Sequence, residues 1–289
     1  MILFIKLADV YHILSILFKL PFSMMKRILV PTDFSDCATQ ACEYAAQLCL
    51  EQQLDMTLLH VMHVPVVDGV HHIPLPNELM EAQREQYDKK LKTLKDELAA
   101  KYPINIECSA QYGLAADLIV SLSEELEMDM IVMGTNGDSG LLDKIFGSVS
   151  LAVSKNSQIP LLVLPHDSTY RPIEALAFAY DNQENIDAEK LFIKSLNKKG
   201  VTKIHILSVE PDKAKGEYSE EVVYDNKDAK EVAIWASSIT DGLSKYNSKN
   251  NIGILAVKRH HRSFFNDLFH KSTTKALLSD NKMPLLIFN

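Results

Sequence analysis

Short apolar runs alternate with helical segments along the first 165 residues, and this alternation restricts the possible folds more than any other feature of the chain. The runs are rich in Val, Ile, Leu and Met and lack polar alternation, which is typical of strands covered on both faces. They lie at 27–30, 56–64, 104–113, 128–134 and 159–165, with helical patterns between them at 37–50, 78–102, 114–127 and 139–156. The alternation predicts a doubly wound, parallel α/β sheet.

The second half of the chain repeats the strand pattern of the first. Residues 173–181, "IEALAFAYD", match residues 25–33, "MKRILVPTD", at an offset of 148, which pairs Asp181 with Asp33. Residues 204–209 keep that offset relative to the second apolar run. The chain is therefore expected to contain two tandem copies of one fold.

Later in the chain the offset between the two copies becomes shorter. Residues 253–258 and 282–288 match the fourth and fifth apolar runs at an offset of 124. The second copy thus lacks 24 residues between its second and fourth strands, about the length of one helix with its loop. We expect the second copy to be degenerate and shorter, without a counterpart of the 78–102 helix.

Length and the polar junction 166–172, "HDSTYRP", predict two domains, at 25–167 and 171–289. Residues 1–24 are expected to be an extension outside the fold. They are apolar but contain Lys6, Asp9, His12 and Lys19, so an uninterrupted membrane span is not expected. A signal peptide is not expected either, because the segment lacks a basic cluster at its start and an A-x-A-like cleavage site. An interfacial amphipathic helix is the alternative for this segment.

Charge and cysteine content narrow the possible partners. The net charge of −8 and the lack of a basic stripe argue against nucleic acid. The four cysteines, Cys37, Cys42, Cys49 and Cys108, match no zinc or disulfide spacing. We expect the cysteines to be small, buried hydrophobic residues of a protein in the reducing cytoplasm.

The glycine-rich segment that follows the fourth apolar run predicts an anion-binding site. Gly134-x2-Gly137-x9-Gly147-Ser148 joins a central strand to a helix, and ligands of open α/β sheets bind at the carboxyl ends of the strands. Gly134 would allow a close turn beside a sugar. Gly137, Gly147 and the Ser148 hydroxyl would approach phosphate oxygens. Alternatively, the glycines only shape a turn and let a helix pack on the sheet, and Asp33 only caps a helix.

These features resemble the universal stress protein family, in its tandem two-domain form, over nearly all of residues 25–289. The family's nucleotide signature, G-x2-G-x9-G-S/T, is matched at every required position, and "ILVPTDFS" is similar to the family's first strand and loop. The resemblance implies a Rossmann-like fold of the adenine nucleotide alpha hydrolase type, binding of ATP or another adenine nucleotide, and a role in the stress response.

The resemblance also implies the residues of the site. The base and ribose would contact Pro31, Thr32, Asp33, Val61, Met133 and Gly134, and the phosphates would contact Asn136, Gly137, Gly147, Ser148, Val149 and Ser150. Two residues depart from the family pattern. Asn136 stands where histidine is frequent, and Asp138 places a carboxylate near a triphosphate, which would weaken binding unless Mg²⁺ intervenes.

The second copy has lost the glycines. Lys258, His261 and Lys271 occupy the positions of Gly134, Gly137 and Gly147, and Ser272 alone matches. We therefore expect one nucleotide, bound in the first domain only. The basic and aromatic segment 258–278 could bind phosphate through side chains, but a solvated or domain-contact face is the preferred interpretation.

Other kinds of site receive less support. His60, His63, His71 and His72 lie in a strand and its loop without metal-ligand spacing, so they are expected to be core or loop residues. No catalytic triad, carboxylate pair or activated cysteine can be assembled, so at most weak ATP hydrolysis is expected. A scaffold that binds no nucleotide is the alternative function. An ATP-using enzyme such as an adenylating ligase is less favoured, because "VPTDFSD" lacks the S-G-G-x-D-S loop.

The last strand of each copy predicts the assembly. Both strands would be exposed apolar edges, and such edges are usually covered. Single-domain members of the family dimerise through their last strand. The resemblance therefore implies an intramolecular pseudo-dimer, with 161–164 antiparallel to 285–288, and leaves a homodimer of the whole chain open.

Overall fold

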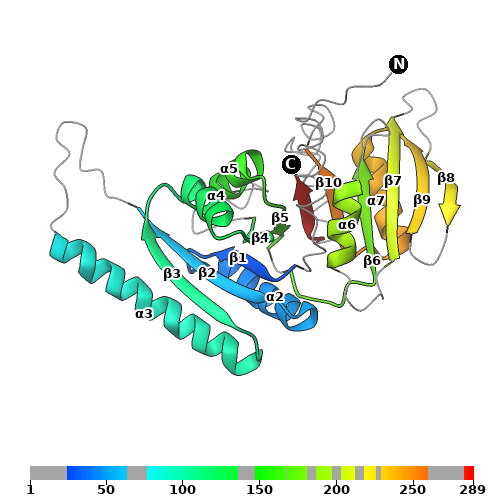
Figure 1. Cartoon of the computed structure of the whole chain (residues 1–289). Helices are drawn as coiled ribbons and strands as arrows, with labels where there is room; N and C mark the ends of the chain where they lie inside the picture. The colour runs from blue at the N-terminus through cyan, green and yellow to red at the C-terminus, as the bar shows by residue number, and fades with distance from the viewer. Residues whose placement is uncertain are drawn as a thin grey trace, which may run out of the picture.

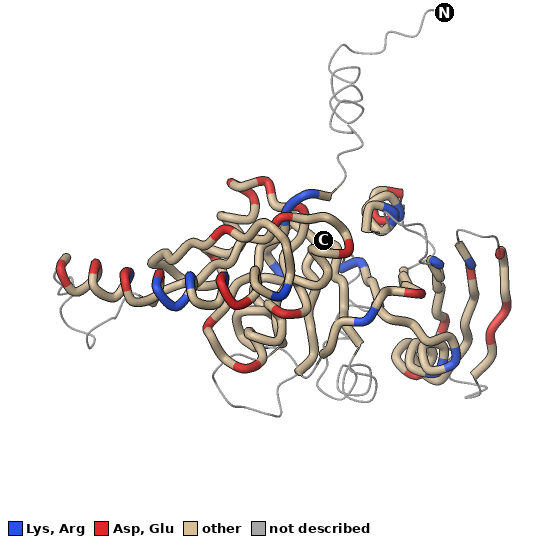
Figure 2. The backbone as a smooth tube through the Cα atoms, turned by 90° about the horizontal axis from the view of Figure 1, so that it is seen from below, with Lys and Arg blue, Asp and Glu red and all other residues tan. Residues whose placement is uncertain are grey.

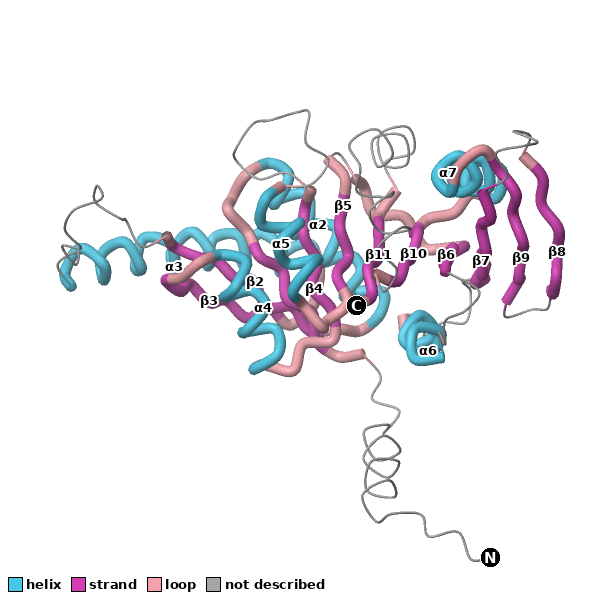
Figure 3. Tube along the Cα trace, turned by 90° about the horizontal axis from the view of Figure 1, so that it is seen from above, coloured by secondary structure: helices cyan, strands magenta, loops and turns pink. Residues whose placement is uncertain are grey.

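The computed structural model describes residues 25–63, 77–135, 147–166, 168–180, 187–196, 203–211, 218–225, 229–259 and 283–289. Its strands form one 11-stranded sheet in the order β3-β2-β1-β4-β5-β11-β10-β6-β7-β9-β8. Figure 3 shows this order from β4 to β8. The first half of the sheet comes from residues before 166 and the second half from residues after 174.

The first half has the predicted alternation of strands and helices. Its strands are β1 (Arg27–Pro31), β2 (Asp55–Met62), β3 (Ile106–Tyr112), β4 (Met130–Gly134) and β5 (Leu161–Leu164), all paired in parallel with one another. Its helices are α2 (Asp36–Gln52), α3 (Asn77–Lys101), α4 (Ala115–Glu125) and α5 (Ser148–Asn156). The predicted doubly wound α/β fold is confirmed. Helix α5 begins later than expected, and residues 136–146 lie outside the described residues.

The second half repeats the first at the predicted offsets. Its elements are β6 (Ala175–Tyr180), α6 (Asp187–Ser195), β7 (Lys203–Pro211), β8 (Ser219–Asp225), β9 (Ala229–Ala236), α7 (Ile239–Asn250), β10 (Ile254–Lys258) and β11 (Leu285–Phe288). Strands β10 and β11 follow β4 and β5 by 124 residues, from 130 to 254 and from 161 to 285. The order β9-β7-β6-β10-β11 matches β3-β2-β1-β4-β5.

The two halves differ most where the shorter offset predicts a missing helix. In the first half α3 lies between β2 and β3 in the chain and runs beside β3 (Figure 1). The described residues between β7 and β9 form β8, which pairs antiparallel with β9 at the end of the sheet. Sequence patterns predict neither β8 nor β9, because both strands mix charged and apolar residues.

Strands β5 and β11 join the halves, and they pair antiparallel as predicted. Leu162 lies opposite Leu286, and both side chains are buried, with relative exposures of 1% and 0%. Polar contacts add to the junction, among them the hydrogen bond that Asn289 Nδ2 donates to the Ser157 carbonyl. Arg259 Nη1 donates to the Ser154 carbonyl (2.8 Å) in the last turn of α5, and the Tyr170 hydroxyl donates to Glu51 Oε2 (2.5 Å) on α2.

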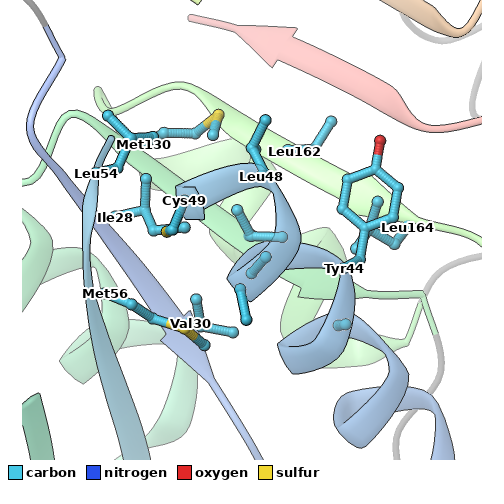
Figure 4. Packing of buried hydrophobic residues seen from close by; sticks show 14 of the residues in the cluster. Ile28, Val30, Tyr44, Leu48, Cys49, Leu54, Met56, Met130, Leu162 and Leu164 are labelled. Atoms are coloured by element: carbon cyan, nitrogen blue, oxygen red, sulfur yellow. The ribbon is translucent and has the colours of Figure 1, made fainter. Parts of the chain in front are cut away.

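The core lies on both faces of the sheet and continues across the junction. Helices α2, α3 and α6 pack on one face, and α4, α5 and α7 pack on the other. Figure 4 shows the first of these layers, where Tyr44 and Leu48 of α2 meet Leu162 and Leu164 of β5. Burial on both faces accounts for the uninterrupted apolar runs.

The cysteine prediction is correct for α2 and wrong for β3. Cys37, Cys42 and Cys49 are buried in α2, and burial raises the pKa of the Cys42 thiol to about 12. Cys108 is exposed, because β3 is the last strand at its end of the sheet and α3 covers it only in part. All four thiols are free.

The structure also bears on the predicted partners. Within the described ranges, no helix is long and apolar enough to cross a membrane. Figure 2 shows lysine and arginine interspersed with aspartate and glutamate, for example along α3. The predicted extension at residues 1–24 and its alternative, an interfacial helix, lie outside the described residues.

A buried histidine in the second half predicts a pH-dependent stability. On β7, His205 Nδ1 lies 2.9 Å from the hydroxyl oxygen of Tyr246 on α7. Burial, followed by the charges of Lys230 and Lys203, lowers the pKa of His205 to about 4. Between about pH 6.5 and pH 4 the unfolded chain therefore binds a proton that the folded chain does not. The free energy of unfolding therefore has its full value, as far as His205 is concerned, above about pH 6.5, and it decreases as the pH falls toward 4.

We expect His205 to reduce the free energy of unfolding by about 2 kcal/mol between pH 7.5 and pH 5. Urea unfolding of wild type and His205→Gln at both pH values checks this, because the variant should lose less stability on acidification. The exposed His63→Gln is the matched control. Burial also lowers the pKa of His60, so some pH dependence should remain in every variant. Equal losses in wild type and His205→Gln would contradict the prediction.

Candidate functional site

A cavity of about 510 Å³ opens at the carboxyl ends of β1, β2 and β4. Ten of the twelve predicted site residues line it: Pro31, Thr32, Asp33, Val61, Met133, Gly134, Gly147, Ser148, Val149 and Ser150. The other two, Asn136 and Gly137, lie outside the described residues. Segments more than 100 residues apart in the chain thus meet at the edge of the sheet where ligands of open α/β folds bind.

The turn after β1 forms one side of the cavity. The Phe34 N–H donates to Thr32 Oγ1 (3.1 Å), and the N–H and hydroxyl of Ser35 donate to Asp33 Oδ1 (3.0 and 2.6 Å). Ser35 Oγ in turn accepts from the Ala38 N–H (3.2 Å), so Ser35 is the N-cap of α2. The alternative that Asp33 caps the helix is therefore wrong, since Asp33 holds the capping serine in place.

Phe34 has an unusual backbone conformation in this turn. Its φ of 64° is in the left-handed region, which is uncommon for a residue with a bulky side chain. The surrounding hydrogen bonds and ring contacts hold it there. Such strained residues concentrate at ligand-binding sites, because the structure around the site maintains them.

Gly134 at the end of β4 is required by packing. A Cβ atom at this position would lie 2.6 Å from Cys37 Sγ and 3.0 Å from the Cys37 carbonyl oxygen. The start of α2 therefore lies directly against the backbone of β4. This contact supports the interpretation that the glycine lets a helix pack on the sheet, whether or not a ligand is bound.

The N-terminus of α5 forms the opposite side of the cavity. Its N-cap is Gly147, which has no side chain to accept a hydrogen bond from the helix start, in contrast to Ser35 and Ser238, which cap α2 and α7. The first backbone N–H groups of α5 therefore receive no hydrogen bond from the cap residue's side chain, and a helix N-terminus beside a cavity attracts anions. The Gly147 N–H donates to the Thr135 carbonyl, which brings the two ends of the 136–146 segment together.

The serines at this helix start have different roles. Ser148 is exposed, so its hydroxyl can reach a ligand. Ser150 is buried, and its hydroxyl donates to the carbonyls of Gly147 (3.1 Å) and Thr135 (3.3 Å). Ser150 therefore stabilises the turn, and its side chain is already engaged within the protein.

Three aromatic rings, of Phe34, His60 and Tyr87, form an aromatic wall beside the cavity. His60 stacks on Tyr87 (4.1 Å between ring centroids) and lies 4.8 Å from Phe34. Its Nδ1 donates to the Thr32 carbonyl (2.8 Å), and burial lowers its pKa. Lys90 Nζ lies 5.0 Å from the centroid of Tyr87. His60 is thus neutral at pH 7, which leaves Nε2 as a hydrogen-bond acceptor.

Sequence reasoning missed the part of the cavity that other elements supply. The missed lining residues are Ala38, Leu59, His60, Met62, His63, Gln83, Tyr87, Ala115, Ile119 and Thr135. Gln83 and Tyr87 belong to α3, and the Tyr112 hydroxyl of β3 donates to the Met80 carbonyl (2.8 Å) to hold that helix. Their helical spacing gives no sign of the cavity, whereas the position of His60 next to Val61 could have suggested one.

The histidines do not form a metal site in the part of the chain that the structure describes. His60 is buried in β2 and His63 is exposed after it, while His71 and His72 lie outside the described residues. No group of three or more His, Cys, Asp or Glu side chains that could hold a metal ion occurs among the described residues.

The second half has an ion pair at the position that matches Gly134. Lys258 at the end of β10 pairs with Glu189 on α6, with 2.8 Å between Nζ and Oε1. Both side chains are largely buried, with relative exposures of 17% and 9%. Asp181, His261, Lys271 and Ser272 lie outside the described residues. Where the first half has a glycine, the second half therefore has a buried charged pair.

Comparison with known proteins identifies relatives for both halves. The family model described as "Universal stress protein family" matches residues 24–165. Universal stress protein MJ0531 of Methanocaldococcus jannaschii is 31% identical over 161 residues, which cover 56% of this chain and 94% of that protein. Slr1230 of Synechocystis, also a universal stress protein, is 22% identical over 290 residues and covers 91% of this chain and 100% of its own.

Solved structures agree with the tandem arrangement. A universal stress protein from Archaeoglobus fulgidus superposes with a TM-score of 0.67 at 16% identity, covering 91% of this chain and 98% of its own. This similarity shows a shared fold over both halves.

Proposed function

The chain belongs to the universal stress protein family, and from this premise we propose that it binds one adenine nucleotide, ATP with Mg²⁺, in the cavity of its first half. The observation that carries the proposal is the N-terminus of α5, whose cap residue Gly147 has no side chain, beside a cavity lined by ten of the predicted site residues. A volume of about 510 Å³ is in the range of small-molecule sites.

The residues present fit the chemistry of a nucleotide. The first N–H groups of α5 and the Ser148 hydroxyl are donors for phosphate oxygens, as the glycine signature implies. Apolar and aromatic side chains, such as Met133 and Tyr87, line other parts of the cavity and suit a base and sugar. Asp138 belongs to the same loop sequence, and Mg²⁺ would offset the repulsion between its carboxylate and a triphosphate.

The proposal extends to the organisation of the chain. We treat residues 25–167 and 171–289 as two domains, of which the second binds no nucleotide because Lys258, paired with Glu189, stands where the first domain has Gly134. The paired β5 and β11 would make the second domain a permanent partner of the first. In this view the protein is a cytoplasmic stress-response regulator whose ATP-bound and empty states differ in affinity for other proteins.

A scaffold that binds no nucleotide is the second candidate function. The close contact between Gly134 and Cys37 favours it, because this contact explains one glycine of the signature without a ligand. Titration calorimetry with ATP and Mg²⁺ distinguishes the two candidates. One site per chain supports the proposal, whereas no binding supports the scaffold.

A substitution at the start of α5 tests the site itself. Ser148 is the first residue of the helix, where proline is tolerated, and Gly147 has φ −63° and ψ 157°, which suit a residue before proline. Ser148→Pro therefore removes one N–H donor and the hydroxyl while keeping the helix. We expect the affinity for ATP to fall about 10- to 100-fold, because hydrogen bonds to a charged ligand are lost.

Three further variants serve as controls for this titration. Ser148→Ala removes the hydroxyl alone and should lose less affinity than Ser148→Pro. Gly137→Lys should abolish binding, and Lys271→Gly should not create a second site. Unchanged affinity in Ser148→Pro, or two sites in the wild type, would contradict the proposed position of the phosphates.

A further inference from the structure

Strand β8 is the last strand at one end of the sheet, and its outer edge faces away from all other strands (Figure 1). All seven of its side chains are exposed. Three consecutive residues are apolar or aromatic, Val222, Val223 and Tyr224, with relative exposures of 50%, 65% and 50%. An exposed apolar edge strand is a template for pairing with another strand.

The other end of the sheet is arranged differently. There α3 packs against β3, and the Tyr112 hydroxyl holds the helix with a hydrogen bond to the Met80 carbonyl (2.8 Å). In the second half β8 takes the place of that helix in the chain, and it is only a single strand. A register shift in β8 places Val222 opposite Val232 and Tyr224 opposite Glu231, so Val223 has no register partner on β9.

The acidic residues of β8 are partly compensated within the chain. Asp225 forms an ion pair with Lys203 (2.7 Å), and Glu220 accepts a hydrogen bond from the Tyr218 hydroxyl. Lys249 Nζ lies 4.2 Å from the centroid of the Tyr218 ring. Glu220 and Glu221 form no ion pair with any residue in the described ranges, so their charges are not neutralised there. Because Asp225 is paired with Lys203, the strand repels a like-charged partner less than its sequence suggests.

The charge pattern of β8 selects one way of pairing the strand with itself. In an antiparallel pair centred on Val222, Glu221 faces Val223, Glu220 faces Tyr224, and Ser219 faces Asp225. A centre between Val222 and Val223 is excluded by geometry, because residues directly opposite each other would face different sides of the sheet. A centre on Val223 would place Glu221 opposite Asp225. Like charges directly opposite are destabilising, so the pair centred on Val222 is favoured among these registers.

We propose that β8 pairs antiparallel with β8 of a second copy of this chain, across a twofold axis at Val222. The chain already uses antiparallel pairing of strand edges to join β5 with β11. A contact of one strand per subunit buries little surface, so the dimer is of the weak, reversible class. The two sheets become continuous, and the cavities of the two first halves lie at opposite ends of the dimer.

Sedimentation velocity over a concentration series of the full chain tests the dimer. We expect the sedimentation coefficient to rise with concentration in the wild type and to stay at the monomer value in Val222→Lys. Leu79→Lys, an exposed position on α3, is the matched control and should dimerise like the wild type. Higher salt should strengthen the dimer by screening Glu221. A wild type that stays monomeric at high concentration overturns the proposal, as does a dimer that Val222→Lys leaves intact.

Cross-linking tests the register. In a Cys108→Ser background, Val222→Cys should form a disulfide-linked dimer under mild oxidation, because residues on the axis are about 4.5–5.5 Å apart between Cα atoms. Val223→Cys should not, since the two Val223 positions lie diagonally across the pair, with Cα atoms about 7–8 Å apart, beyond the reach of a disulfide. Efficient cross-linking of Val223→Cys instead of Val222→Cys would overturn the proposed register. ATP binding is not required for either result, so the dimer can fail while the nucleotide site holds.

Discussion

Gly134→Ala is expected to destabilise the chain by about 3 kcal/mol, as overpacking of a filled core does. The added Cβ would lie 2.6 Å from Cys37 Sγ and 3.0 Å from the Cys37 carbonyl oxygen. The thiol can rotate only within a buried site, and the carbonyl belongs to the first turn of α2, so neither atom can move without shifting the helix. Urea unfolding at pH 7.5 measures the loss.

Two further variants separate overpacking from the general cost of replacing a glycine. At Gly253 the nearest atom to an added Cβ is the Ala175 carbonyl oxygen at 3.5 Å, so Gly253→Ala should change stability by less than about 1 kcal/mol. Combining Gly134→Ala with Cys37→Ala removes the thiol contact and should restore part of the loss. If Gly134→Ala is as stable as the wild type, the interpretation of the glycine as a packing requirement is wrong.

The double variant Leu162→Lys with Leu286→Lys is expected to separate the two halves of the sheet or to unfold the chain. The two residues lie directly opposite each other on β5 and β11, with relative exposures of 1% and 0%. Two ammonium groups would face each other in the core without acidic partners, and a buried unpaired charge costs several kcal/mol. This is a large part of the total stability of a typical domain, about 5–15 kcal/mol. Sedimentation velocity and urea unfolding measure the two outcomes.

Leu162→Met with Leu286→Met keeps the volume and polarity of the junction, so it should retain the hydrodynamic size and most of the stability of the wild type. A fragment of residues 25–167 tests the same contact, because it contains β5 without its partner β11. Its β5 edge would be vacant, and we expect the fragment to form a homodimer through it. A stable monomeric fragment at high concentration, or a double-lysine variant that behaves like the wild type, would contradict the pseudo-dimer.

The sequence by itself determined the layered fold and its repetition. Strands that are buried on both faces require uninterrupted apolar residues, and this requirement acts locally, so β1 and β4 are visible without knowledge of their neighbours. The offset of 124 residues survives in β10 and β11 because each position keeps the same place in the core. The glycine signature likewise marked the end of β4, since the spacing of glycines in a loop can be read from residues that are close together in the sequence.

Tertiary structure alone decided what depends on segments that are distant in the chain. Tyr87 reaches the cavity because α3 packs beside β2, and Gly134 is indispensable because the start of α2 lies against β4. The Lys258–Glu189 pair and the replacement of a helix by β8 also depend on contacts between segments that are distant in the chain. Helical or alternating periodicity reports which face of an element is buried. It does not report what covers that face, because the partner is chosen by packing across the whole sheet.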